Sequence, residues 1–339
     1  MCKSKSVGGI IAKTLLSLLI IILAFVLIIG LIVPTINYLI KEDVKVYDGL
    51  TNPHISKERT FISAHRAGGD LAPEETLSAF ELCMTDTSYS VDVVEFDLHI
   101  TKDGNLILLH DDTVNRTSDA TERFGKDEVY AKDLTLAELK TLNFGENFVD
   151  PDGNTPYKGK RGDDIPDNVK VLSLKEILDY LTATKSDLNY VIEIKDDGDL
   201  GKKAMDMLYK TLVEYNILNQ TIVGTFHNTI TKYIDEAYPD VIRSASIMEV
   251  LGMYLGFLFN VQTKLTYSYS FEVLQIPVGM FVWDFGDAGF INYAHKRNIA
   301  VQYWTINDTE EADRLRKNGA DCIITDNPKA IYNKFNAKA

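Results

Sequence analysis

The sequence predicts an α/β fold, a TIM-type (β/α)8 barrel with an insertion after its second strand and one transmembrane helix before it. Two observations support this prediction. From residue 58 onward, short runs rich in β-branched and aromatic residues alternate with helical patterns over about 280 residues, close to the size of such a barrel. Before residue 34, one apolar run is long enough to cross a bilayer. The predicted segments are a short cytoplasmic N-terminus (1–13), a transmembrane helix (14–33), a linker (34–57) and a barrel domain (58–339).

The apolar run at residues 14–33 contains no charged side chain, and about 20 such residues suffice for a helix to span a bilayer. Lys3, Lys5 and Lys13 precede the run, whereas charges of both signs follow it. The positive-inside tendency therefore predicts a single-pass protein of the cell membrane, with the barrel on the extracytoplasmic side. A cleaved signal peptide is the alternative, but its apolar region is usually about 7–15 residues long and ends at a small-x-small site, which residues 31–34 lack.

Eight runs are predicted to be barrel strands, because each is short, β-rich and followed by polar or helical residues. An Asp-Gly turn at residues 103–104 predicts a hairpin that brings His110 back beside the second strand. Between about residue 112 and residue 170, clusters of Gly, Pro, Asn and Asp interrupt the pattern and predict an insertion above the barrel mouth. The predicted strands are residues 61–65, 93–98, 190–194, 221–226, 242–247, 279–283, 300–306 and 322–325.

Two carboxylates on the second predicted strand indicate a metal site. Glu95 and Asp97 are two residues apart, so their side chains point to the same face of the sheet, where they could share a hard divalent cation. A structural ion pair with Lys or Arg is the alternative. Two inward-facing carboxylates together with Glu193 on another strand are hard to neutralise without a cation, so we favour the metal.

The net charge of -14 argues against electrostatically driven nucleic-acid binding, which needs a basic face. An anionic phosphodiester substrate would need local positive charge instead, from a cation and from Arg66 and Lys195. His65 and His110 lie near predicted strand ends, and histidine titrates near neutral pH, so it can take and give protons. This combination of residues indicates phosphodiester hydrolysis.

A series of short motifs follows the predicted strands in order, from residue 65 to residue 328. They are His65-Arg66, Pro73-Glu74-Glu75-Thr76, Ala79-Phe80, Glu95-x-Asp97, Thr101-x-Asp103-Gly104, His110-Asp111, Glu193-x-Lys195, Trp304-Thr305-x-Asn307 and Thr325-Asp326-x-Pro328. Together they resemble the glycerophosphodiester phosphodiesterase family, whose fold is a TIM-like barrel. The usual pattern reads His-Arg-Gly and Pro-Glu-Asn-Thr, so Ala67 and Glu75 depart from it.

The resemblance implies hydrolysis of a glycerophosphodiester, either a small molecule or derived from a lipid, to glycerol 3-phosphate and an alcohol. In the family mechanism, the glycerol 2-hydroxyl attacks phosphorus and water then opens the cyclic phosphate. The sequence does not assign which histidine acts first as base. The implied roles are binding of one divalent cation, Ca²⁺ or Mg²⁺, by Glu95, Asp97 and Glu193, acid–base catalysis by His65 and His110, phosphate binding by Arg66 and Lys195, and lining of the substrate pocket by Trp304.

Two alternatives remain beside this reading: a lysophospholipase D-type lipid phosphodiesterase, and a noncatalytic barrel that binds phosphodiesters. Residues 247–261 are too apolar for an ordinary surface helix and too short to span a membrane. We expect them to touch the membrane, to form an apolar rim for a lipid chain, or to be buried against the insertion or a second copy. The sequence does not set the oligomeric state.

Several further side chains carry smaller expectations. Glu75 is expected to face solvent at a helix start, or, if it points inward, to add negative charge near the substrate. Cys83 and Cys322 are expected to be buried as small hydrophobic residues. Four histidines outside the motifs are expected at loop edges or helix caps, namely His54, His99, His227 and His295.

Overall fold

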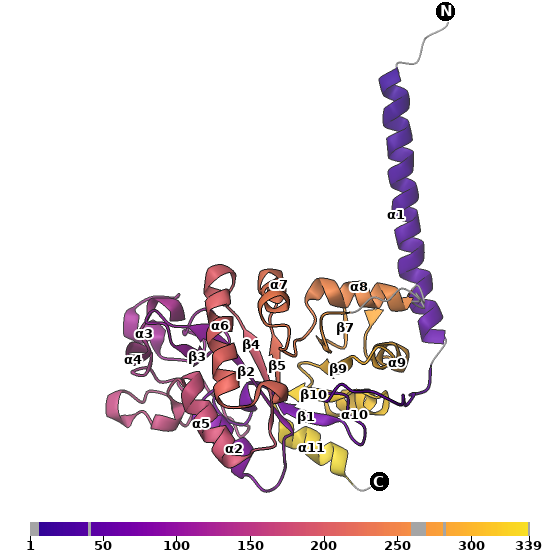
Figure 1. The fold of residues 1–339 in the computed structure, drawn as a ribbon. Coiled ribbons are helices and arrows are strands. Elements are labelled where there is room, and N and C mark those ends of the chain that lie inside the picture. The colour runs from indigo at the N-terminus through magenta and orange to yellow at the C-terminus, as the bar shows by residue number, and fades with distance from the viewer. Residues whose placement is uncertain (1–6, 40–41, 259–268, 281–282, 338–339) are drawn as a thin grey trace, which may run out of the picture.

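The computed structural model describes residues 7–39, 42–258, 269–280 and 283–337 (Figure 1). Its central sheet contains parallel strands in the spatial order β5-β4-β2-β1-β10-β9-β6. Most of their residues are buried, because a parallel sheet is covered on both faces. The strands are β1 (Phe61–Ala64), β2 (Val93–Ile100), β4 (Asn189–Ile194), β5 (Thr221–Gly224), β6 (Val273–Ile276), β9 (Ala300–Tyr303) and β10 (Cys322–Thr325).

The sheet closes into a barrel between β5 and β6. Arg243 forms a single parallel bridge with Val223 of β5, and Ser244 forms one with Val273 of β6. The predicted barrel with eight strand positions is therefore confirmed. The predicted strand 242–247 is reduced to two bridging residues, because helix α8 (Ile247–Leu258) begins where that strand was expected to end.

The predicted barrel strand at residues 279–283 is wrong. β7 (Gly279–Met280) and β8 (Trp283–Asp284) form a separate antiparallel pair, and the barrel strand is β6, which precedes them. β6 reads Val-Leu-Gln-Ile and pairs with β9 over four residues. Both runs are short and β-rich, so local composition does not decide between them; pairing with a distant strand does.

Helices surround the barrel and pack apolar side chains against the strands (Figure 1). α5 shows how the sequence builds such a helix. Ser173 and Glu176 form a capping box at its start, and Leu174, Ile177 and Leu181 lie on its buried face. The outer helices are α2 (Leu77–Thr85), α5 (Leu174–Thr184), α6 (Gly198–Glu214), α7 (Asn228–Ala237), α8, α9 (Ala288–His295), α10 (Thr309–Lys317) and α11 (Pro328–Asn336).

The predicted hairpin and insertion follow β2. β3 (Leu106–Leu108) runs antiparallel to β2 after the turn at Gly104, whose φ is +82°, a value that glycine adopts without strain. The chain then forms α3 (Ala120–Phe124), α4 (Leu136–Leu139) and three 3-10 turns at Ala131–Asp133, Gly162–Asp164 and Asp167–Val169. This insertion has a small core of its own, which includes Leu109, Val114 and Leu142.

The chain before β1 covers the amino-terminal end of the barrel. The Asn52 side-chain amide donates to the carbonyls of Glu272 and Asn298 at 2.7 and 3.0 Å, close to the starts of β6 and β9. Ile55 is 5% exposed and belongs to a cluster inside the barrel. Residues 50–60, most of which fall in the predicted linker, thus pack as a plug. The cluster also contains Val93, Val191, Ile222, Val273, Ala300, Cys322 and Ile324.

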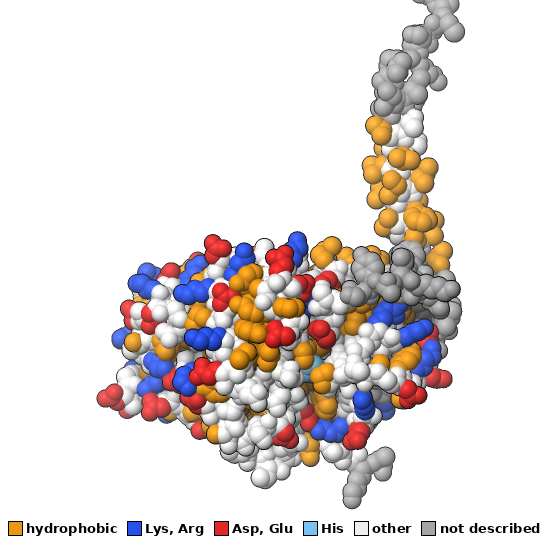
Figure 2. Space-filling view, in the orientation of Figure 1, with side chains coloured by type: hydrophobic (Ala, Val, Ile, Leu, Met, Phe, Trp, Pro, Cys, Tyr) orange, Lys and Arg blue, Asp and Glu red, His pale blue; other side chains and the backbone are white. Residues whose placement is uncertain are grey.

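Helix α1 (Val7–Leu39) projects away from the barrel (Figure 1), and its apolar side chains form a band in Figure 2. The span Thr14–Ile32 has a mean hydropathy of 3.4, and none of it is buried inside the molecule. By length and composition this helix could cross a membrane, a test that an N-terminal signal sequence also passes. A further 3-10 turn at Leu218–Gln220 precedes β5.

Candidate active site

All the sequence-predicted site residues line one cavity of about 310 Å³ at the carboxyl-terminal ends of the strands. Side chains at this end of a parallel barrel come from different strands but meet in one place, which is where barrel enzymes carry out their chemistry. The predicted residues in its wall are His65, Arg66, Glu95, Asp97, His110, Glu193, Lys195 and Trp304.

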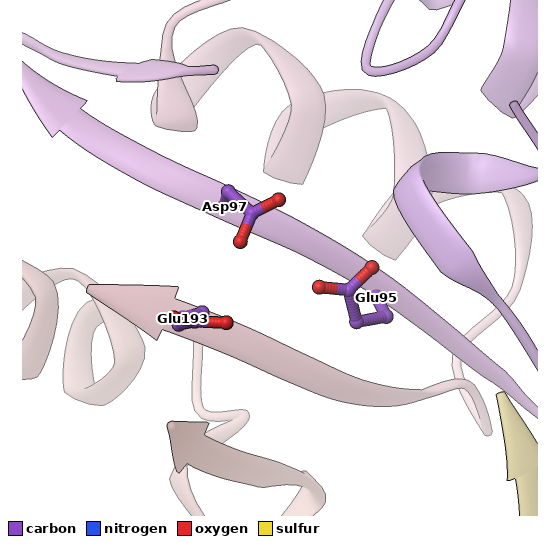
Figure 3. Close-up of side chains that lie close together, drawn as sticks. All are labelled: Glu95, Asp97 and Glu193. Atoms are coloured by element: carbon purple, nitrogen blue, oxygen red, sulfur yellow. The ribbon is translucent and has the colours of Figure 1, made fainter. Parts of the chain in front are cut away.

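Three carboxylates form the centre of the cavity. Glu95 and Asp97 extend from the same face of β2, and Glu193 extends toward them from β4 (Figure 3). Asp97 and Glu193 are direct partners in the parallel register of the two strands. One oxygen of each carboxylate lies within 4.8 Å of the other two, a spacing that could hold a metal ion. The alternation of side chains along β2 therefore places its two acids as predicted.

The electrostatics of this cluster favour a bound cation. Burial and the neighbouring charge of Asp97 raise the pKa of Glu95 and of Glu193 to about 7. Both oxygens of Asp97 are buried and accept no hydrogen bond from the described residues. Lys195 Nζ and Arg66 Nε lie 3.4 and 3.7 Å from them and form ion pairs without a hydrogen bond. Three carboxylates thus face two basic side chains, and the excess negative charge suits a divalent metal.

His65 follows β1 in a tight turn that folds over Glu95, whose Oε2 accepts a hydrogen bond from the Arg66 backbone N–H at 2.7 Å. The Nδ1 atom of His65 lies 2.6 Å from Asp326 Oδ1, and its Nε2 lies 4.0 Å from Glu95 Oε2. Burial disfavours the charged imidazole, but the carboxylates of Glu95 and Asp326 outweigh burial and raise the pKa of His65.

His110 reaches the same cavity from the end of the β2–β3 hairpin, as predicted. Its Nδ1 lies 2.7 Å from Asp111 Oδ1. Burial lowers the pKa of His110, and the charge of Asp97 and the hydrogen bond with Asp111 offset this only in part. The two histidines therefore have the same arrangement, with Nδ1 held by a carboxylate and Nε2 left for another partner, while their pKa values shift in opposite directions.

A charged network connects the two histidine-bearing segments. Arg116, from the insertion, contacts both oxygens of Glu74 at 2.9 and 2.7 Å, and its Nε lies 2.5 Å from Asp111 Oδ2. Glu74 Oε1 also accepts a hydrogen bond from Arg66 Nη1 at 3.2 Å. Asp111, which orients His110, is thereby linked to Arg66, which follows His65.

The expectation that Glu75 faces solvent is wrong. Glu75 is 4% exposed, and its Oε1 accepts a hydrogen bond from the Asp97 backbone N–H at 2.7 Å. Its φ of +57° turns the chain immediately before α2 and directs the carboxyl group inward. Burial and the charge of Asp97 raise the pKa of Glu75 well above its ordinary range. A fourth acidic group thus points inward beside the carboxylate cluster, and its raised pKa favours the neutral form over an added negative charge.

His99 is also placed differently from the expected loop edge or cap. It lies within β2, which extends to Ile100, is 3% exposed, and its Nδ1 lies 2.9 Å from Asp196 Oδ1. His54 and His295 are buried as well, whereas His227 is the N-cap residue of α7. Cys83 and Cys322 are buried free thiols, as expected.

Four residues that matter to this geometry received no role from the sequence: Asp111, Asp326, Glu74 and Arg116. The first three belong to the quoted motifs, so the signal was present, but their hydrogen-bond partners were not known. Asp326 is 261 positions away from His65 along the chain. Arg116 lies in the insertion, where no motif marked it.

Comparison with known proteins agrees with the family resemblance found in the sequence. The model of the "Glycerophosphoryl diester phosphodiesterase family" matches residues 65–330. A glycerophosphodiester phosphodiesterase from Caldanaerobacter subterraneus subsp. tengcongensis is 26% identical over 275 residues, which cover 81% of this chain and 97% of the relative. Human glycerophosphodiester phosphodiesterase 1 is 24% identical over 287 residues, covering 80% of this chain and 78% of that protein.

Solved structures share the fold. A phosphodiesterase from Oleispira antarctica, in complex with the product sn-glycerol-3-phosphate, superposes with a TM-score of 0.61 at 20% identity, covering 82% of this chain and 98% of that one. The glycerophosphoryl diester phosphodiesterase domain of a Mycobacterium tuberculosis protein gives a TM-score of 0.63 at 16% identity, covering 80% and 98%.

Proposed function

The chain belongs to the glycerophosphoryl diester phosphodiesterase family, and on this premise we propose that it hydrolyses glycerophosphodiesters by two-histidine catalysis around one divalent cation, tethered to the membrane by α1. The enzyme class, a phosphoric diester hydrolase, follows from the family. The cation, the roles of individual residues and the anchor are our proposal.

The observation that carries the proposal is the buried cluster of three carboxylates, which outnumber the two basic side chains beside them. Glu95, Asp97 and Glu193 have the oxygen donors that Mg²⁺ and Ca²⁺ prefer, and the buried oxygens of Asp97 accept no hydrogen bond within the described residues. A cation held there would offset the charge of the nonbridging phosphate oxygens as they approach the acids. Arg66 and Lys195 lie beside the cluster and would hold the same phosphate group.

The histidines supply the proton transfers in this proposal. One histidine takes the proton of the glycerol 2-hydroxyl while its oxygen bonds to phosphorus, and the other gives a proton to the departing alcohol oxygen. Water then opens the cyclic phosphate to glycerol 3-phosphate with the two roles exchanged. Asp326 and Asp111 orient the rings, so that each Nε2 faces the cavity.

The anchor is supported by α1, whose span Thr14–Ile32 could cross a bilayer. With the N-terminus in the cytoplasm, the barrel would lie on the extracytoplasmic side of the cell membrane. Protease added to intact cells should then remove the barrel while the N-terminus stays protected. Release of the barrel into the medium without α1 would instead indicate a cleaved signal peptide.

The activity can be tested with the full chain in nanodiscs and glycerophosphocholine as substrate. We expect release of glycerol 3-phosphate that stops with EDTA and returns with Mg²⁺ or Ca²⁺. His65→Ala and His110→Ala should each lower kcat about 10²–10⁴-fold. His54→Gln, at the opposite end of the barrel, is the matched histidine control and should keep its turnover. Binding of substrate without any turnover would contradict the proposal and favour the noncatalytic barrel.

A further inference from the structure

The cavity has two chemically different halves, and the order of the strands separates them. The charged lining residues come from β1, β2, β4 and the segments that follow them. Going round the barrel from β5 through α8 and β6 to β9, the lining becomes mainly apolar. Its members on this side include Phe226, Ile247, Val250, Leu251, Pro277 and Met280.

Helix α8 explains why this half is apolar. Its first turns supply Ile247, Val250 and Leu251 to the cavity wall. Tyr254 follows at the same helical spacing and, with Met253, is buried in the core. The helix therefore contributes apolar side chains to both the cavity and the core, which accounts for the apolar run found in the sequence up to residue 258; residues 259–261 lie outside the described part of the chain.

The mouth of this half is open and apolar. Phe226, Ile247 and Met280 line the cavity and still expose 47%, 55% and 37% of their surface. Hydrophobic side chains are visible at the position of α8 in Figure 2. A small phosphodiester such as glycerophosphocholine has no long apolar part to bury there. The wall is continuous with the phosphate-binding end, so its natural occupant is another part of the same substrate molecule.

We propose that this apolar half, the α8 lobe, binds the hydrocarbon chain of a single-chain glycerophosphodiester amphiphile. The inference rests on the proposed function, because the chain enters only when its phosphodiester is held at the charged half. The proposed chemistry requires a free hydroxyl beside the phosphoester. A substrate with one acyl chain on the glycerol keeps that hydroxyl, whereas a diacyl lipid does not.

The reaction then balances as for the small substrate. The free glycerol hydroxyl forms the new O–P bond and loses its proton to one histidine. The P–O bond to the head-group alcohol breaks, and the other histidine protonates that oxygen. Water opens the cyclic ester, so the products are the head-group alcohol and a monoacyl glycerol phosphate, with no oxidant or other co-reactant.

The structure also places helix α8 near the end of α1. α1 ends at Leu39, and three residues later Glu42 lies within hydrogen-bond distance of Asn292 in α9, a separation of at most about 10 Å for an extended chain. α9 packs against the C-terminal end of α8 through Phe257 and Phe290, whose ring centroids are 5.5 Å apart. If α1 spans a bilayer, α8 therefore lies one helix away from the point where the chain leaves it, and the lobe lies at the other end of α8.

A chain-length series tests the proposal with the full chain in nanodiscs. The substrates are glycerophosphocholine and its 1-butanoyl, 1-hexanoyl and 1-octanoyl esters, all supplied as monomers in water. We expect kcat/KM to rise about fourfold for each CH₂ group that enters the lobe, and at least about tenfold across the series. Choline release with formation of the monoacyl glycerol phosphate identifies the broken bond.

Two variants connect the effect to the lobe. Leu251→Asn should lower the ratio of kcat/KM for the octanoyl ester to that for glycerophosphocholine at least about tenfold. Val250→Phe stays apolar and fills the lobe, so it should shift the preferred chain to a shorter one even if Leu251→Asn fails to fold. Leu255→Asn is the matched control, because Leu255 lies on α8 outside the cavity lining, and this variant should keep the wild-type ratio.

The outcomes distinguish the two proposals. Turnover of glycerophosphocholine with a flat chain-length profile, or a Leu255→Asn effect as large as that of Leu251→Asn, overturns the α8 lobe and leaves the proposed function standing. No turnover of any of the four substrates in the presence of Mg²⁺ or Ca²⁺ overturns the proposed function itself.

Discussion

The two ends of the barrel differ in the hydrogen bonds that their buried carboxylates accept. At the amino-terminal end, Asp321 accepts hydrogen bonds from the backbone N–H groups of Ser56 and Val301 at 2.8 and 2.6 Å, and His295 Nε2 lies 2.8 Å from it. At the carboxyl-terminal end, both oxygens of Asp97 are buried and accept no hydrogen bond from the described part of the chain. The residue type and the burial are the same, but the partners differ.

This difference separates stability from function. A buried carboxylate whose lone pairs are filled by protein donors fixes the chain segments that supply them. A buried carboxylate without such donors costs free energy in the folded state and keeps its lone pairs for a ligand. We therefore expect substitutions at the amino-terminal end to change stability and those at the carboxyl-terminal end to change turnover.

The largest effect should come from Asp97→Asn. Removing this charge weakens the cation site, so kcat/KM should fall about 10³-fold or more, while Tm stays constant or rises because the repulsion of Asp97 on the buried carboxylates of Glu95 and Glu193 is relieved. Asp321→Asn is the matched control at the other end. It should lower stability by about 1–3 kcal/mol and leave the turnover of the folded fraction unchanged. If both variants lost activity and stability together, the division between the two ends would be wrong.

The plug at the amino-terminal end gives the next effect. Ile55→Ala should lower the free energy of unfolding by about 3 kcal/mol, since it leaves a cavity among buried side chains inside the barrel. Denaturant unfolding followed by circular dichroism measures this loss. Activity assayed well below the transition should stay at the wild-type value. A large change in KM would show that the packing of the plug affects the substrate cavity.

Part of the pH dependence of stability should come from a histidine at the amino-terminal end. Burial lowers the pKa of His54 from 6.5 to about 4. The unfolded state therefore binds more protons than the folded state between these values, and stability falls as the pH falls. From pH 7.5 to pH 5 this histidine should cost about 2 kcal/mol. His54→Gln should remove that part of the slope in Tm against pH; an unchanged slope would assign it to other groups.

Much of this organisation could be predicted from sequence, because it depends on short-range periodicity. Glu95 and Asp97 share a face through strand alternation, and the Asp-Gly turn returns His110 to their side. The alternation of short strands with helical patterns predicted the barrel. Each of these inferences uses local patterns of residue type, and none requires a contact between distant parts of the chain.

The features that were missed depend on distant partners or on unusual backbone geometry. The choice of residues 273–276 over 279–283 as a barrel strand depends on pairing with β9. Glu75 points inward because of its left-handed φ, which the neighbouring residues do not predict. His65 and Asp326 meet only because β1, near the start of the barrel domain, pairs with β10, near its end. Neither composition nor spacing contains that information.

The smallest effect should come from Arg116, which lies at the carboxyl-terminal end but outside the cavity lining. It joins Glu74 to Asp111 and so holds the carboxylate that orients His110. Arg116→Gln should lower kcat about tenfold and shift the pH profile of kcat, because Asp111 would hold the His110 ring less firmly; KM for glycerophosphocholine should change less.

The matched control for this variant is Arg161→Gln in the same insertion. Arg161 pairs with Asp119 and Glu146, away from the cavity, so its loss should affect Tm and not the pH profile. Equal kinetic effects in the two variants would mean that Arg116 acts only by stabilising the insertion. An effect confined to Arg116→Gln would show that charged residues at the carboxyl-terminal end control turnover even where they do not touch the substrate. At the amino-terminal end, by contrast, a charged residue such as Asp321 contributes only to stability.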